Sequence, residues 1–114
     1  MTILNITTQP TSDGAELMIA GDLDYDSANK LRAAIQAVTL RPGQTLTLNL
    51  AALTFCDSSG IAALIAARNH AQAQSADTVL SNTPAATVHI LRFVGLDQIF
   101  RIRPAAAPGP QPPG

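Results

Sequence analysis

The feature that most constrains this chain is a strand-like run followed closely by a long helical run. From Thr45 to Leu50 polar and apolar residues alternate, which is the period of a half-buried strand. Residues 58–73 are rich in Ala, the strongest helix former. Between the two runs stands Asp57-Ser58-Ser59-Gly60. An Asp or Ser directly before a helical run accepts a hydrogen bond from the first free backbone N–H groups. The pattern therefore predicts a strand, a short connection and a helix that begins at this junction.

The N-terminal part of the chain predicts a hairpin and a helix. Residues 3–8 and 15–20 have the composition of short strands, and the Asp-Gly pair between them favours an antiparallel turn. Residues 25–39 carry apolar side chains at helical spacing. Asp24 is the better cap for this helix, with Asp26 and Ser27 as alternatives.

The C-terminal part predicts a strand at 77–81 and a further helix. Thr83 would cap this helix, and Pro84 would take its first position, where a missing N–H costs nothing. Val88, Leu91 and Val94 would form its inward stripe, and Gly95 would end it with a left-handed residue. Residues 99–102 would be a final edge strand or an apolar closing segment.

These segments together predict one α/β domain. A strand, a helix and a strand in succession imply a right-handed crossover and parallel pairing. We expect a single mixed β-sheet of four to five strands, with helices packed on it and the N-terminal β-hairpin at one edge. The domain would span residues 1–103. Residues 104–114, a Pro/Ala/Gly-rich segment without apolar periodicity, would be a disordered C-terminal tail.

Composition excludes several classes of function. The net charge is −1 and no basic run is present, so we expect no direct contact with nucleic acid. No apolar stretch approaches the length of a membrane span, and the default compartment is the cytoplasm. Cys56 is the only cysteine, which rules out an intrachain disulfide and a thiolate metal cluster. We interpret it as a small buried residue.

Three stretches, taken in order, resemble a known family. The segment Phe55-Cys56-Asp57-Ser58-Ser59-Gly60-Ile61 resembles the phosphorylation-site signature of the STAS domain family, in its anti-sigma factor antagonist branch. Gly21-Asp22-Leu23-Asp24 upstream, and the stretch from Thr83-Pro84-Ala85 through Val94-Gly95-Leu96 downstream, match in the expected order. The resemblance spans about Ile3 to Ile102 and implies the STAS fold.

The resemblance also implies a function. Unphosphorylated protein would bind an anti-sigma factor that is also a serine kinase, so that the sigma factor is released. Phosphorylation of Ser58, rather than Ser59, would switch binding off, and a serine phosphatase would reverse it. The partner-binding residues would be Asp22, Asp24, Asp57, Ser58, Ser59 and Gly60. No cofactor is implied, and the protein would be a monomer or weak dimer.

Each of these residues also has a purely structural interpretation. Asp22 and Asp24 could serve a turn and a helix cap, and Asp57 could complement the positive end of the helix dipole. Gly60 could allow close packing onto the sheet instead of leaving room for a partner.

Other functions remain open from the sequence. The same fold could be a STAS accessory subunit of a transporter or of a stress-signalling assembly. A small-molecule or nucleotide-binding module is a further alternative, although no glycine loop surrounds Ser58. We do not expect an enzyme, because Ser58 has no evident general base. The two histidines, His70 and His89, fall in helical runs away from it.

Overall fold

The computed structural model describes residues 2–105, which form six strands, three α-helices and one short 3-10 helix. In chain order these are β1 (Asn5–Thr11), β2 (Gly14–Leu23), α1 (Ala28–Gln36), β3 (Thr45–Asn49), β4 (Leu53–Cys56), α2 (Ser58–Ala73), β5 (Asp77–Thr83), α3 (Ala85–Phe93), η1 (Leu96–Gln98) and β6 (Arg101–Pro104).

The strands form one mixed sheet in the order β1-β2-β3-β5-β6, and β4 pairs with the end of β2 outside this path. The β1–β2 hairpin is antiparallel and lies at one edge, whereas all other pairs are parallel. The predicted mixed sheet with an N-terminal hairpin is therefore confirmed. The predicted strand count of four to five is too low, because β4 has only four residues and shows no readable period.

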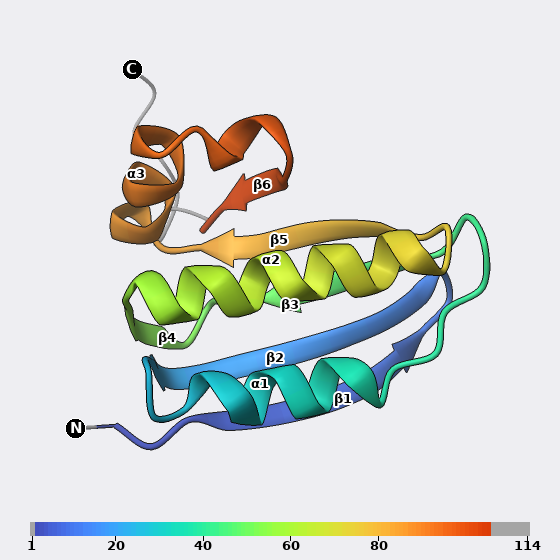
Figure 1. The fold of residues 1–114 in the computed structure, drawn as a ribbon, viewed down its shortest axis with the longest axis horizontal. Helices are drawn as coiled ribbons and strands as arrows, with labels where there is room; N and C mark the ends of the chain where they lie inside the picture. Colours follow the sequence, from blue (N-terminus) through green and yellow to red (C-terminus); the bar gives the residue numbers. More distant parts are fainter. Residues whose placement is uncertain (1, 106–114) are drawn as a thin grey trace, which may run out of the picture.

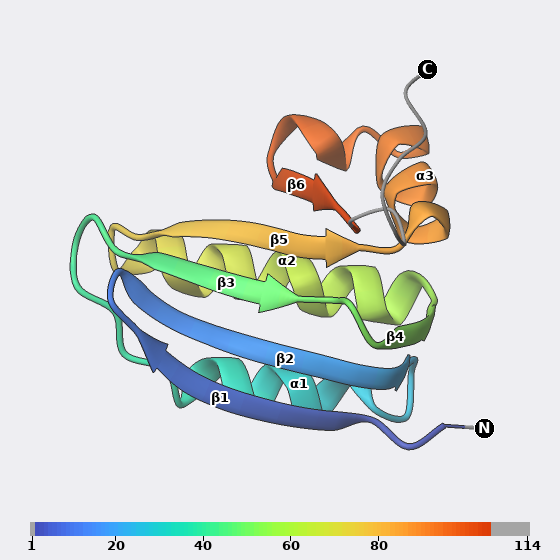
Figure 2. The ribbon, with the colours of Figure 1, turned by 180° about the vertical axis from the view of Figure 1, so that it is seen from behind.

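Helices α1 and α2 cover the same face of the sheet, and among the described residues the opposite face carries no helix (Figures 1 and 2). Leu46 and Leu48 of β3, and Leu50 directly after the strand, are fully buried on the face of the sheet that the helices cover. Burying one such side chain stabilises the fold by about 2 kcal/mol. The alternation of apolar and polar residues along β3 therefore determines the face on which the helices pack.

Helix α2 lies close to its neighbours because its inner face is built from small residues. Ala63, Ala67 and Ala71 recur every four residues and are fully buried, with Leu64 beside them. The helix spans the residues that the sequence predicted, Ser58 to Ala73. Helix α1 is shorter than the predicted range 25–39 at both ends, because residues 25–27 form a turn and the helix already ends at Gln36.

The C-terminal part, α3, η1 and β6, forms a lobe beyond β5 (Figure 1). Gly95 has φ 81° and ends α3, as predicted. The predicted cap is wrong: Pro84 occupies the N-cap position, and α3 begins at Ala85. The Thr83 side chain is fully buried and donates to the carbonyl of Leu80 at 3.2 Å, so it cannot cap the helix.

The final strand extends through Pro104, and the amide of Ala105 donates to the carbonyl of Thr83 at 2.9 Å. Residues 104 and 105 thus contact the domain, and the predicted boundary at residue 103 stays a prediction. The remainder of the predicted tail, residues 106–114, lies outside the described residues.

Candidate functional site

The turn from β4 into α2 is organised by Asp57. Its backbone is extended, and its carboxylate accepts a hydrogen bond from the Gly60 amide at 3.0 Å, which caps the helix as predicted. Its own amide donates to the carbonyl of Leu23 at 3.2 Å, and its carbonyl accepts from Ile61 at 3.0 Å. Asp57 therefore anchors the start of α2 to the end of β2.

Ser58, the first residue of α2, is exposed, whereas Ser59 is half-buried. None of the hydrogen bonds formed among residues 2–105 involves the hydroxyl of Ser58. Because Asp57 already satisfies the helix start, the Ser58 hydroxyl is left free for other chemistry.

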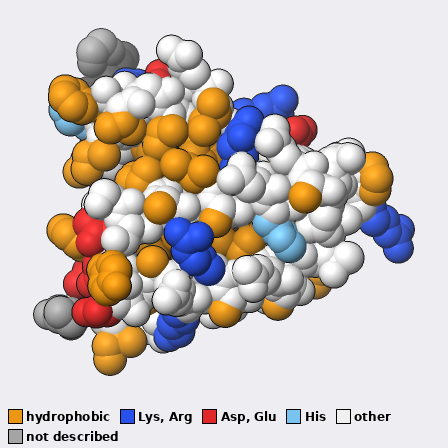
Figure 3. All heavy atoms as spheres, in the orientation of Figure 1, with side chains coloured by type: hydrophobic (Ala, Val, Ile, Leu, Met, Phe, Trp, Pro, Cys, Tyr) orange, Lys and Arg blue, Asp and Glu red, His pale blue; other side chains and the backbone are white. Residues whose placement is uncertain are grey.

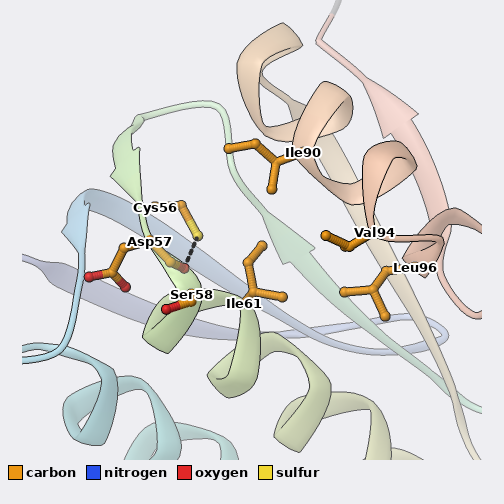
Figure 4. A pocket seen from close by; sticks show the side chains of 7 residues that line it. All are labelled: Cys56, Asp57, Ser58, Ile61, Ile90, Val94 and Leu96. Carbon is orange, nitrogen blue, oxygen red and sulfur yellow. Dashed lines mark hydrogen bonds between the residues drawn. The ribbon is translucent and has the colours of Figure 1, made fainter.

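Ser58 stands at the rim of a cavity of about 360 Å³ between α2 and the C-terminal lobe. In Figure 4, Ile61 of α2 faces Ile90, Val94 and Leu96 across this cavity. The full lining is Cys56, Asp57, Ser58, Ile61, Ile90, Val94 and Leu96. We call it the apolar cavity. Val94 was predicted to point into the core, but it is 55% exposed and lines this cavity instead.

Exposed apolar side chains continue beyond the apolar cavity. A smaller groove of about 200 Å³ shares Cys56 and Ile90 with it and extends to Phe55, which is 52% exposed. Figure 3 shows hydrophobic side chains gathered where α2 and α3 meet. An exposed apolar surface rimmed by polar residues is typical of a protein interaction site.

Ser59 faces different surroundings. It lines a groove of about 470 Å³ between α1 and α2, together with Arg32, Asn29 and Tyr25 among others. The two adjacent serines thus border surfaces of opposite character, Ser58 an apolar one and Ser59 a polar one.

Gly60 is buried beneath the turn. A Cβ at this position would lie 2.7 Å from the carbonyl oxygen of Leu23 and 2.8 Å from the sulfur of Cys56. Close packing onto the end of β2 therefore requires glycine here. The structural interpretation of Gly60 holds, and contact with a partner stays a prediction.

The second predicted group, Asp22 and Asp24, lies at the same end of the sheet, because Leu23 of β2 pairs with Cys56 of β4. The carboxylate of Asp24 accepts from the amide of Ser27 at 3.0 Å, and its carbonyl accepts from Ala28 at 2.8 Å. Ser27 occupies the N-cap position of α1 but makes no cap bond with its side chain. Asp24 therefore fixes the turn into α1, as one of its structural interpretations predicted, but the prediction that it caps the helix is wrong, because the turn 25–27 separates it from Ala28.

Asp22 holds two segments that are distant in sequence. One carboxylate oxygen accepts from the Thr54 hydroxyl at 2.6 Å, and the other accepts from the amide of Thr2 at 3.1 Å. These hydrogen bonds, with Thr54 contributing most, lower the pKa of Asp22 below its usual value. No sequence motif marked Thr54, whose partner lies 32 residues away.

Neither the cysteine nor the histidines supply a base for Ser58. Burial, followed by the charge of Asp57, raises the pKa of the Cys56 thiol to about 12. His70 is half-buried, with Nε2 at 2.7 Å from the carbonyl oxygen of Val38, which requires that nitrogen to be the donor. It is also about 18 Å along α2 from Ser58. His89 is exposed on α3.

Residues 2–105 hold neither a cluster of metal ligands nor a membrane-spanning helix. No three His, Cys, Asp or Glu side chains come together there as metal ligands. Within the same range, none of the helices has the length and apolar character needed to cross a membrane.

Comparison with known proteins places the chain in a family. A family model described as "Mlab, STAS domain" matches residues 6–104, almost the whole chain. A STAS-domain containing protein of Pseudomonas aeruginosa is 31% identical over 99 residues, which cover 85% of this chain and 97% of the relative. The protein therefore belongs to the STAS domain family.

Further relatives are anti-sigma factor antagonists. The anti-sigma F factor antagonist of Lysinibacillus sphaericus is 28% identical over 87 residues, covering 75% of this chain and 74% of the relative. The unphosphorylated anti-sigma factor antagonist SpoIIAA superposes with a TM-score of 0.65 at 22% identity, covering 91% and 90% of the two chains. An anti-sigma factor antagonist from Mycobacterium paratuberculosis superposes with a TM-score of 0.73 at 23% identity, covering 90% and 86%. These structures share the fold.

Proposed function

We propose that this protein is an anti-sigma factor antagonist controlled by phosphorylation of Ser58. In its unphosphorylated form it would bind an anti-sigma factor with serine kinase activity and so free the sigma factor. The observation that carries the proposal is the exposed, unengaged hydroxyl of Ser58 at the rim of the apolar cavity. The names of the curated relatives support the same class of partner. We propose the cytoplasm as the compartment in which this protein acts.

The apolar cavity supplies the binding energy in this proposal. Ile90 and Val94 are 40% and 55% exposed, and Phe55 lies beside them, so a docked partner would remove their apolar surface from water. Asp24 and Asp57 would border the contact as acidic groups, and Asp22 lies at the same end of the sheet. Acidic side chains gather along this edge in Figure 3.

A phosphoryl group on Ser58 would act on the interface and not on the fold. It adds about −1.5 to −2 charges at neutral pH, beside the positive end of the α2 dipole, which tolerates negative charge. In the complex the same charge would be desolvated against Ile61 and the far wall of the apolar cavity. A loss of about 3 to 4 kcal/mol would weaken binding about 150- to 800-fold. A serine phosphatase would restore the binding form.

Ser58 is a better phosphoacceptor than Ser59 for a geometric reason. Ser58 is exposed at the first position of α2, whereas Ser59 is half-buried against the groove between α1 and α2. A kinase reaches the first serine with less local unfolding of the helix.

The experiment is incubation of the protein with ATP and each candidate serine-kinase anti-sigma factor from its own source, followed by intact-mass and peptide mass spectrometry. We expect one phosphoryl group on the peptide that contains Ser58, and none on the Ser58→Ala variant. Modification that persists in Ser58→Ala but disappears in Ser59→Ala would contradict the site assignment.

A second candidate is a STAS accessory subunit of a transporter or of a larger assembly. The matching family model and the Pseudomonas aeruginosa relative are described as STAS domains without mention of an anti-sigma factor. The apolar cavity would then hold a permanent partner. Stable capture of such a partner, with no phosphorylation by any candidate kinase, would favour this function.

A further inference from the structure

Strand β4, which delivers the chain to Ser58, is attached to the sheet on one side. Among the described residues it pairs only with β2, at Gly21, Asp22 and Leu23, and the register shifts between Gly21 and Asp22. A four-residue strand with one neighbour and an irregular ladder has few backbone bonds to hold it. Its position therefore depends on additional contacts.

The Asp22 side chain supplies such a contact. Its carboxylate accepts from the Thr54 hydroxyl in the middle of β4 at 2.6 Å, a short distance for a hydrogen bond to a charged group. Its other oxygen accepts from the amide of Thr2, and its backbone amide donates to the carbonyl of Thr2, both at 3.1 Å. One residue thus ties the N-terminal segment, β2 and β4 together.

We propose that Asp22 is a positioning residue for Ser58, acting through Thr54. Both carboxylate oxygens of Asp22 accept hydrogen bonds from this chain, so Asp22 affects partner binding indirectly. From Thr54 the chain runs along β4 into Asp57, whose amide is bonded to the carbonyl of Leu23, and then into Ser58. Fixing Thr54 therefore fixes the turn that presents the serine. The claim that Asp22 promotes phosphorylation of Ser58 rests on the proposed function. The claim that Asp22 fixes the turn does not.

The first test is hydrogen exchange on the free protein. Thr54→Val removes the hydroxyl with little change of shape, and Thr54→Ser keeps it as the matched control. We expect the Asp57 amide to exchange about fivefold faster in Thr54→Val, the equivalent of one modest hydrogen bond, and near the wild-type rate in Thr54→Ser. Unchanged exchange in Thr54→Val would overturn the proposal whether or not any kinase modifies Ser58.

The second test is a double-mutant cycle on kcat/KM for Ser58 phosphorylation and on Kd for the unphosphorylated partner complex. If Asp22 acts through Thr54, Asp22→Ala has no further effect in the Thr54→Val background. If Asp22→Ala weakens binding equally in both backgrounds, Asp22 acts independently of Thr54 and the proposal is wrong. Absence of phosphorylation in every variant, with exchange altered as expected, would count against the proposed function and leave the positioning role supported.

Discussion

Two serines stand at the starts of the two helices that cover the sheet, and the structure treats their hydroxyls in opposite ways. Ser27 Oγ accepts from the amide of Asp24 at 2.9 Å and donates to the carbonyl of Asp22 at 2.8 Å. Ser58 Oγ has no hydrogen-bond partner within residues 2–105 and is exposed. The difference comes from the neighbouring carboxylate. Asp57 caps α2 itself and leaves Ser58 free, whereas Asp24 and Ser27 satisfy one another.

The contrast shows how to separate a structural serine from one available for modification. A hydroxyl engaged with backbone groups must break those bonds before it can react, and its loss leaves buried polar groups unsatisfied. A free hydroxyl beside a capped helix start can be modified without damage to the fold. Substitution by alanine should therefore reduce stability at Ser27 but not at Ser58, and should abolish phosphorylation at Ser58 but not at Ser27.

The largest expected effect is on modification. Ser58→Ala should abolish phosphorylation completely while changing the free energy of unfolding by less than about 0.5 kcal/mol, as is usual at a surface site. Ser27→Ala should remain a substrate but lose about 1 to 2 kcal/mol, because two hydrogen bonds are lost. Mass spectrometry and urea unfolding of both variants measure this. Equal stability loss in the two variants would break the comparison.

The next largest effect concerns the reactivity of the Cys56 thiol, which lies directly before Asp57. Since the pKa of Cys56 is raised to about 12, its thiol stays protonated at pH 8 and the reactive thiolate is scarce. Alkylation by iodoacetamide should be at least about a hundredfold slower than that of a free cysteine with an ordinary pKa of about 8.5. The rate should rise continuously as pH increases toward the raised pKa. A plateau near pH 9 would show that the thiol is not shielded as described.

A smaller effect on stability tests the close packing of Gly60 against the carbonyl of Leu23. Gly60→Ala adds a methyl group 2.7 Å from the carbonyl oxygen of Leu23, and this crowding exceeds the helix-propensity gain of alanine. We expect a net loss of about 1 to 2 kcal/mol in urea unfolding. Ser59→Ala, one position earlier and less buried, is the control and should be close to neutral. A stabilised Gly60→Ala protein would mean that the turn relaxes freely.

The smallest effect compares the carboxylates of Asp57 and Asp24, each of which accepts from the amide three residues further on. Asp57→Ala should cost about 1 kcal/mol, because the amide of Gly60 loses its acceptor, and Asp57→Asn should recover most of it. Asp24→Ala should cost a similar amount, since Asp24 accepts from Ser27 in the same way. Urea unfolding of the three variants measures this. If Asp57→Ala is neutral, water replaces the cap and the explanation for the free Ser58 hydroxyl fails.

Local signals were read correctly from the sequence. The bounds of α2 followed from an Asp cap and a run of alanines, both of which act within a few residues. The left-handed Gly95 at the end of α3 is another such signal. The predicted site residues meet at one end of the sheet because the ends of parallel strands do.

What was missed depends on contacts between distant segments. Strand β4 exists because it pairs with β2, and Thr54 matters because Asp22 reaches it across 32 residues. Thr83 has the residue type of a cap, but burial in the core directs its hydroxyl to Leu80 instead. The apolar cavity also escaped prediction, since its far wall belongs to the C-terminal lobe, and only the packed fold places Val94 there.

The central claim is that Ser58 phosphorylation controls binding at the apolar cavity. The most direct measurement is titration calorimetry of one preparation of the protein against its kinase partner, with nucleotide absent, before and after stoichiometric phosphorylation of Ser58. We predict that Kd rises several hundred-fold on phosphorylation and returns to its first value after phosphatase treatment. An unchanged Kd for the phosphorylated protein would contradict the account.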